Sequence, residues 1–136
     1  VGGGGDPRYA AELKRDIAQR GLHQRVVFRG PLPHDQLPAV YSSAQLTLVP
    51  SLCGEGTSLS ALESMACGTA TICTDVAGLL DLPGPHALPL VHSLAETMRE
   101  VYPNRAGVGE EQREAVLARY SLEHWQRAWR EALSLL

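Results

Sequence analysis

The chain has 136 residues, of which 44% are hydrophobic and 20% charged, and its formal net charge is −3. These values are typical of one compact domain, which we expect to span residues 1–136. No run of Lys or Arg is long enough to follow a nucleic-acid backbone, no apolar run approaches the roughly 20 residues of a membrane span, and the first residues do not resemble a signal peptide. We therefore expect a cytoplasmic protein with no nucleic-acid partner and no membrane span.

The first half of the chain predicts alternating helices and short strands. Asp6 is a suitable N-cap, Pro7 suits the first helical position, and Gly21 suits the end of that helix. Short apolar runs rich in β-branched residues, each bounded by Gly or Pro, predict strands. The remaining predicted elements before residue 92 are a strand at 26–28, a helix at 35–43, strands at 46–49 and 69–74, and a fourth strand at 87–91.

These strands lack a clean polar and apolar alternation and are separated by helices. Such a pattern favours a parallel sheet that is buried on both faces. Right-handed crossovers then produce a Rossmann-like α/β unit with helices on both faces, in which ligands bind beyond the carboxyl ends of the strands. The turn that contains Glu55 follows the predicted strand at 46–49, so it lies at such an end.

The last third of the chain predicts three helices, at 93–101, 109–119 and 122–136, with Ser121 as the N-cap of the last. The final helix carries an apolar stripe. We expect this stripe to pack on the core of the same domain; the alternative is a closing helix that crosses onto another domain. The stripe consists of Leu122, Trp125, Trp129, Leu133 and Leu136.

Cysteines and histidines do not form a metal-binding pattern. Cys53, Cys67 and Cys73 contain no C-x-x-C pair, and the five histidines contain no H-E-x-x-H. An odd number of cysteines fits reduced thiols better than a disulfide framework. We predict no metal and no cofactor.

The most informative segment runs from Gly54 to Gly68, where Glu55 and Glu63 lie eight residues apart across a Gly/Ser/Thr turn that opens a helix. Small residues let the backbone approach a ligand, and the free N–H groups of a first helical turn favour negative charge, so a diphosphate could dock there. An ionised carboxylate only accepts hydrogen bonds, as from ribose or hexose hydroxyls. The alternative is that both glutamates are ordinary exposed carboxylates.

From Pro50 to Asp81 the chain resembles the C-terminal domain of a GT-B fold retaining glycosyltransferase of family 4, in the glycosyl transferases group 1. The family pattern is P-S, a short loop, E-G-x-x-L, three residues, E-A-M-A-x-G-x-P-V and D-x-x-G. Thr57-Ser58 stands where many members have Phe-Gly. The matching positions here are Pro50-Ser51, Glu55-Gly56, Leu59, Glu63 to Gly68, Asp75 and Gly78, and upstream Arg25 to Gly30, Leu37, Tyr41 and Ala44.

This resemblance implies a nucleotide-sugar-binding domain that takes part in polysaccharide biosynthesis. A hexosyl group would pass from a nucleoside-diphosphate sugar to a glycan or lipid-linked acceptor. Glu63 would hold the ribose hydroxyls, and Glu55 would contact the donor sugar as the catalytic residue. The remaining implied donor-binding positions are Gly56, Thr57, Ser58 and Leu59 for the diphosphate and sugar, and Arg29 and Gly30 for the base.

By the same resemblance, the segment that begins at Val1 corresponds to the end of the family domain's second strand. The first strand, with an Arg and a Lys for the diphosphate, and the N-terminal acceptor domain are therefore expected outside residues 1–136, with 109–136 as closing helices. The fragment alone is expected to be inactive. A lipid-linked acceptor would bring the full enzyme to a membrane surface.

Other functions use similar residues. A GT-B-like sugar-nucleotide 2-epimerase and a non-catalytic binding module of the same fold remain open. A glycosidase pair is disfavoured, because eight helical residues separate two carboxylates by about 12 Å along the axis, more than such enzymes use. Gly2 to Pro7 fails the G-x-G-x-x-G pattern, and Gly56 to Ser60 fails the G-x-S-x-G pattern of serine hydrolases.

Overall fold

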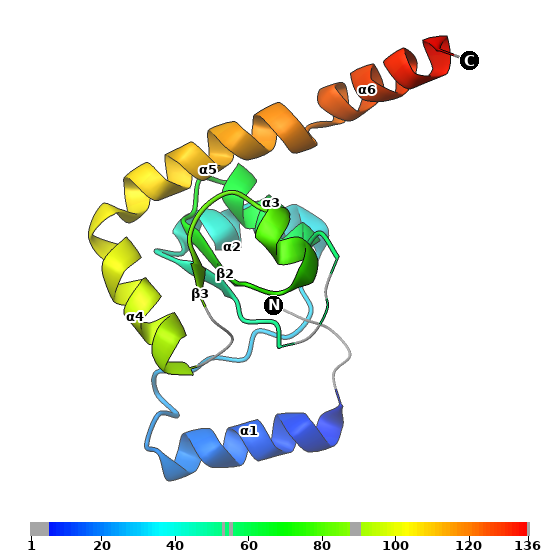
Figure 1. Ribbon diagram of the computed structural model, residues 1–136. Helices are drawn as coiled ribbons and strands as arrows, with labels where there is room; N and C mark the ends of the chain where they lie inside the picture. Colours follow the sequence, from blue (N-terminus) through cyan, green and yellow to red (C-terminus); the bar gives the residue numbers. More distant parts are fainter. Residues whose placement is uncertain (1–5, 53, 55, 88–90, 136) are drawn as a thin grey trace. The chain divides into compact units, whose positions relative to one another are not determined.

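A computed structural model describes residues 6–52, 54, 56–87 and 91–135 (Figure 1). The chain divides into two compact units, Val1–Leu37 and Pro38–Leu136, and each is described by itself. No helix in the described residues is both long and apolar enough to cross a lipid bilayer.

The first unit is built around helix α1, Pro7–Gln19, which confirms the first predicted helix. Pro7 occupies the first helical position, and the Asp6 carboxylate accepts a hydrogen bond from the Arg8 N–H at 2.9 Å. Gly21, with φ +67°, follows the helix end in the left-handed conformation that glycine adopts without strain. The start and stop signals in the sequence were therefore sufficient to locate this helix.

The strand predicted at 26–28 is wrong. The N–H of Val26 bonds to the carbonyl of Leu22 at 3.1 Å, so that amide belongs to a turn. A strand also needs a hydrogen-bonded neighbour, and no described residue pairs with this segment. The side chains of Val27 and Phe28 are 77% and 50% exposed, so burial does not hold the segment extended either.

The predicted helix at 35–43 is confirmed, with its first turn in 3₁₀ form. A 3₁₀ helix covers His34–Gln36, and α2 follows over Leu37–Ser43. Its side chains are mostly exposed, but Tyr41 is buried.

The second unit contains a parallel sheet in the order β1-β2-β3. The strands predicted at 46–49 and 69–74 are confirmed as β1, Thr47–Val49, and β2, Thr71–Thr74. The fourth predicted strand appears as β3, His86–Ala87; residues 88–90 lie outside the described part, and Val91 already belongs to a helix. All four residues of the central strand β2 are buried.

Helices cover both faces of this sheet, as the sequence predicted (Figure 1). Cys73 packs on the face covered by α3, Leu59–Ala66, and α5, Arg105–Tyr120. Ile72 points the other way, into the core under α4, Val91–Val101. Successive side chains of a strand alternate between faces, so β2 supplies both cores. Short 3₁₀ helices at Ala77–Asp81 and Tyr102–Asn104 complete the unit.

Helix α5 crosses close to the turn that ends α3. A Cβ atom at Gly109 would overlap the carbonyl oxygen of Gly68, so only glycine allows this approach. Gly68 itself has φ +76°, the left-handed conformation that stops α3. The sequence predicted a helix from Gly109, whereas α5 begins four residues earlier and carries this glycine in its first turns.

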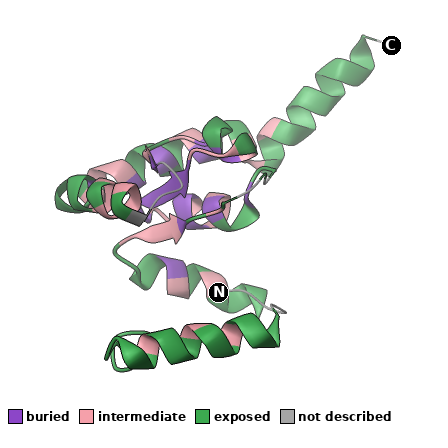
Figure 2. Cartoon of the chain, turned by 60° about the horizontal axis from the view of Figure 1, so that its bottom comes forward, coloured by how far each residue is buried: buried purple, intermediate pink, exposed green. Residues whose placement is uncertain are grey.

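The last predicted helix is confirmed up to Ser134 as α6, Leu122–Ser134, and its predicted last residue, Leu136, lies outside the described residues. The Ser121 hydroxyl accepts the N–H of His124 at 3.2 Å as its N-cap. The expected packing of its apolar stripe on the domain's own core is wrong. Trp125 and Trp129 remain 58% and 52% exposed, and Figure 2 shows α6 exposed along most of its length. The spacing of apolar residues predicts which face of a helix is apolar, but not what covers that face. The alternative, a helix that crosses onto another domain, stays a prediction.

Gln112 of α5 forms hydrogen bonds with the part of the β2 edge that β3 is too short to reach. β3 pairs only with Cys73 and Thr74, so the main-chain groups of Thr71 on that edge have no strand partner. The Gln112 side chain accepts from the Thr71 N–H at 2.8 Å and donates to the Thr71 carbonyl at 2.8 Å and to that of Pro83 at 3.0 Å. One buried amide therefore substitutes for a neighbouring strand.

Replacing Gln112 by methionine should destabilise the protein by about 2–4 kcal/mol, because it leaves buried main-chain donors and acceptors without partners. Urea unfolding measures the change. Gln126→Met on exposed α6 is the matched control and should stay within about 0.5 kcal/mol of the wild type. An equally small loss for Gln112→Met would contradict this role.

Candidate functional site

The loop that carries the predicted site leaves the sheet at the carboxyl end of β1 and leads into α3. Thr74, the last residue of β2, anchors its start: the Thr74 hydroxyl donates to the Ser51 carbonyl at 2.7 Å. The loop thus begins beside the carboxyl ends of two adjacent parallel strands. In open parallel sheets this edge is where ligands bind.

Glu63 lies on α3 and is half-buried. The hydroxyl of Tyr41, from α2, donates to the Glu63 Oε2 atom at 3.3 Å. Burial raises the pKa of Tyr41, and the adjacent Glu63 carboxylate raises it further through its charge and this hydrogen bond. Tyr41 therefore stays protonated and can serve as a donor throughout the physiological range.

Hydroxyl groups next to Glu63 fasten α3 to the sheet. The Ser64 hydroxyl donates a hydrogen bond to the Thr47 hydroxyl of β1 at 2.7 Å and accepts one from the Thr71 hydroxyl of β2 at 2.9 Å. Ser64 and Thr71 are fully buried. Buried hydrogen-bonded networks of this kind rigidify the elements they join. The backbone that carries Glu63 is consequently held by two strands.

The N-terminus of α3 is the second part of the site. Ser58 is its N-cap residue, but the Ser58 side chain makes no capping hydrogen bond; its oxygen lies 3.0 Å from that of Ser60. The first N–H groups of a helix have no partner within the helix and carry a partial positive charge. Thr57 and Leu59 are exposed, whereas Ser58 is only 3% exposed. A ligand would reach these amides from the side of Thr57 and Leu59.

The structure brings together only part of the predicted set. Residues 57 and 58 lead into α3, and its first residue, Leu59, precedes Glu63 by about 6 Å of helical rise. Gly56 is exposed in the loop before them. Glu55 lies outside the described residues. Arg29 and Gly30 belong to the first unit, where Arg29 is exposed and Gly30 has φ +65°.

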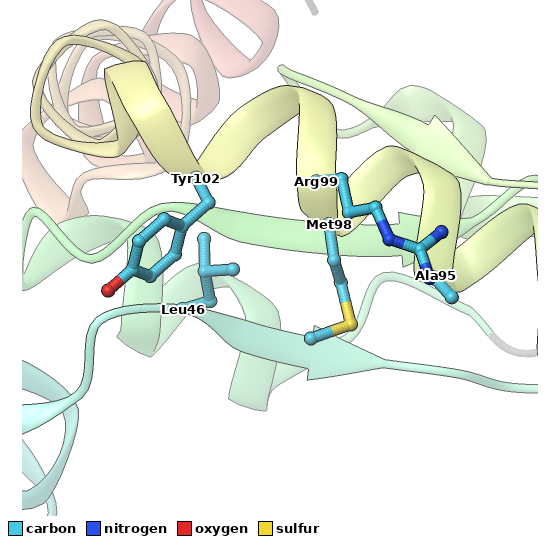
Figure 3. A pocket seen from close by; sticks show the side chains of 5 residues that line it. All are labelled: Leu46, Ala95, Met98, Arg99 and Tyr102. Carbon is cyan, nitrogen blue, oxygen red and sulfur yellow. The ribbon is translucent and has the colours of Figure 1, made fainter.

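A cavity of about 450 Å³ lies elsewhere in the second unit, between the start of β1 and α4 (Figure 3). Leu46, Met98 and Tyr102 give it an apolar lining, with Arg99 alongside. Leu46 and Met98 belong to the core under α4, whereas Glu63 lies on α3, which packs on the opposite face. The cavity therefore contains no residue of the predicted site.

Within the described residues, no group of three or more His, Cys, Asp or Glu side chains could hold a metal ion. The side-chain oxygen atoms around Glu63 and the start of α3 belong to one carboxylate and several hydroxyls, most of which bond to one another. The arrangement provides a carboxylate hydrogen-bond acceptor at Glu63 and main-chain N–H donors at the start of α3.

Sequence reasoning missed the partner of Glu63. Tyr41 matched the family pattern, but no role was assigned to it, because 22 residues separate it from Glu63. It also missed the network around Ser64. Helical spacing from Ala61 places Ser64 on the buried face, which is a signal for a satisfied buried hydroxyl, but only the tertiary structure identifies Thr47 and Thr71 as its partners.

A parallel sheet covered on both faces, with a polar loop and a helix N-terminus at its carboxyl edge, defines a Rossmann-like α/β domain. The chain belongs to the family of glycosyl transferases group 1, whose family model matches residues 1–104.

Several known proteins are similar to this chain in sequence or in structure. Over 100 residues the chain is 37% identical to the 2-deoxystreptamine glucosyltransferase of Streptomyces kanamyceticus. The aligned segment covers 71% of this chain and 26% of that protein. The sucrose-phosphate synthase of Thermosynechococcus elongatus has a similar structure, with a TM-score of 0.81 and 27% identity over 98% of this chain and 38% of that one. The Anabaena protein Alr3699/HepE, in complex with UDP, has a TM-score of 0.85 and 23% identity over 95% of this chain and 37% of that one.

The chain thus spans well under half the length of each of these proteins. The HepE comparison, with its low identity, concerns the fold alone.

Because Tyr41 has a raised pKa, its ionisation should lower the stability of the folded protein at high pH. As the pH rises above about 10, unfolded tyrosine loses its proton while folded Tyr41 keeps it, so the free energy of unfolding should fall. Urea unfolding between pH 8 and pH 11 should show a shallower fall for Tyr41→Phe than for the wild type. Identical pH slopes for the two proteins would contradict a raised pKa.

Proposed function

We propose that this chain is the nucleotide-sugar-binding domain of a retaining glycosyltransferase of family 4, which transfers a hexosyl group from a nucleoside-diphosphate sugar to a glycan or lipid-linked acceptor. The observation that carries the proposal is that α3 carries Glu63 about one turn after an uncapped start, that this start follows the carboxyl end of β1, and that the chain belongs to glycosyl transferases group 1. The name of the Streptomyces relative, a glucosyltransferase, supports hexosyl transfer.

Glu63 is proposed to bind the ribose. An ionised carboxylate accepts hydrogen bonds from two adjacent hydroxyls, and the contact is stronger than one between neutral groups. Glu63 suits this role because it is half-buried and held by Tyr41, so its side chain loses less conformational freedom when the ligand arrives.

The diphosphate is proposed to lie at the start of α3, on the amides of Thr57, Ser58 and Leu59. The positive end of the helix dipole and the unpaired N–H groups there favour a negatively charged ligand. Glu55 would contact the donor sugar as the catalytic residue, with Gly56 allowing close approach of the backbone, and main-chain groups near Arg29 and Gly30 would face the base.

Catalysis would depend on orientation and on stabilising the charge that develops on the departing diphosphate. No metal or other cofactor is part of the proposal. The acceptor, and cations for the diphosphate, would come from outside residues 1–136, in a cytoplasmic enzyme that meets lipid-linked acceptors at the membrane surface.

Product analysis with the full-length protein tests the reaction. A glycosylated acceptor whose new bond has the anomeric configuration of the donor supports the proposal. An epimerised sugar nucleotide would instead indicate a 2-epimerase, and binding without turnover would indicate a non-catalytic module. Either result would overturn the proposed transfer.

Glu63→Gln should weaken binding of a free nucleoside diphosphate by about tenfold, because it replaces a charge-assisted hydrogen bond with a neutral one. Glu55→Gln should leave that affinity nearly unchanged and weaken only binding of the sugar nucleotide. Calorimetry of the full-length protein with UDP and UDP-glucose, and with their adenosine and guanosine counterparts, compares the two variants. Equal losses for both variants with both ligands would be inconsistent with these roles.

Ser58→Pro should weaken diphosphate binding by about tenfold to a hundredfold, because proline removes one main-chain N–H from a charged ligand. The φ of Ser58, −73°, already suits proline, so the fold should persist. Ser58→Ala keeps the N–H and is the matched control, with an expected loss of less than about threefold. Unchanged affinity in a folded Ser58→Pro variant would remove that amide from the site.

A further inference from the structure

Glu63 receives a hydrogen bond from a residue that is far away in the sequence and on a different helix. The Tyr41 hydroxyl of α2 donates to the Glu63 Oε2 atom of α3 at 3.3 Å. Tyr41 is 8% exposed, whereas Glu63 is half-buried. The donor is thus enclosed by the protein while the acceptor keeps an exposed part.

Both ends of this hydrogen bond are anchored independently. The carbonyl of Tyr41 accepts a bond from the Thr69 hydroxyl at 2.7 Å, which ties α2 to a residue just before β2. On the other side, the Ser64 hydroxyl bonds to Thr47 of β1 and to Thr71 of β2. Hydrogen bonds to the sheet, or to the residue just before it, therefore hold both the helix that carries the donor and the helix that carries the acceptor.

We propose that Tyr41 is a positioning residue for ribose recognition: it holds the Glu63 carboxylate in the orientation that accepts the ribose hydroxyls. This inference rests on the function proposed above. A carboxylate that is already oriented loses less rotamer freedom when the ligand arrives, so it binds that ligand more tightly than a free side chain does.

The hydrogen bond from Tyr41 uses only part of the acceptor capacity of a carboxylate. An ionised carboxylate has about four lone-pair sites, so the Tyr41 bond does not prevent Glu63 from accepting hydroxyl groups of a ribose. The Tyr41 hydroxyl is a donor that stays protonated at neutral pH, because burial and the Glu63 charge raise its pKa. It therefore remains a hydrogen-bond donor to the carboxylate under the conditions of ligand binding.

A purely structural role is the competing explanation. A buried tyrosine hydroxyl needs a hydrogen-bond partner, and Glu63 supplies one whether or not a ligand binds. The two explanations differ in one measurable respect. Only a positioning role couples Tyr41 to the ribose hydroxyls of the ligand.

The test uses the full-length protein and calorimetry with UDP, GDP and ADP, and then with the 2′,3′-dideoxy analogue of the diphosphate that binds most tightly. The variants are Tyr41→Phe, Glu63→Gln and the double variant. Tyr120→Phe is the matched control, because its hydroxyl also donates one hydrogen bond, to the Asp81 carbonyl at 3.1 Å, and it lies on α5 rather than beside Glu63. Circular dichroism and thermal unfolding check that each variant is folded.

Tyr41→Phe should weaken binding of the ribonucleotide by about three- to tenfold and should leave the affinity for the dideoxy analogue unchanged. The double variant should bind no worse than Glu63→Gln alone, because Tyr41 acts through Glu63. Tyr120→Phe should bind like the wild type.

Wild-type affinity in Tyr41→Phe, or an equal loss for both ligands, would overturn the positioning role while leaving the proposed function intact, provided that Glu63→Gln weakens binding. If the wild type binds none of the three diphosphates, the proposed function itself fails, and the inference fails with it.

Discussion

Burial of β2 on both faces is the constraint on which the rest of the second unit depends. A central parallel strand must have both faces covered and its main-chain groups paired on both edges. Cys73 and Ile72 meet the first requirement by facing opposite cores, and Gln112 meets part of the second by bonding to the main chain of Thr71. The positions of α3, α4 and α5 follow from this one strand.

The same strand also determines where Glu63 lies. The Thr71 hydroxyl bonds to Ser64, the next residue along α3, and Ser64 bonds to Thr47 of β1. Rotation or sliding of α3 would separate the buried Ser64 hydroxyl from both partners, at a cost of about 1–3 kcal/mol, whereas the Thr71 hydroxyl would keep the Thr69 carbonyl as an acceptor. The same contacts therefore determine the packing of α3 and the position of Glu63. Binding groups are positioned best on rigid elements with a supporting second layer.

Two expectations failed for the same reason. The apolar run at 26–28 and the apolar stripe of α6 were both assigned correctly as apolar, yet Val27 and Trp125 are well exposed. Local patterns indicate which side chains would gain from burial, but burial needs a partner surface. The described residues contain no strand that pairs with 26–28 and no element that covers the stripe of α6.

The sequence alone determined the features that depend on neighbouring residues. The cap at Asp6, the order of most helices and strands, and the Rossmann-like class were predicted correctly, because capping, helical spacing and β-branched runs act over a few positions. Only the tertiary structure decided which residues meet across long separations. Tyr41 bonds to Glu63 across 22 residues. Gln112 bonds to Thr71 across 41. No spacing rule links residues so distant, because the tertiary packing of the helices determines the partners of each polar side chain.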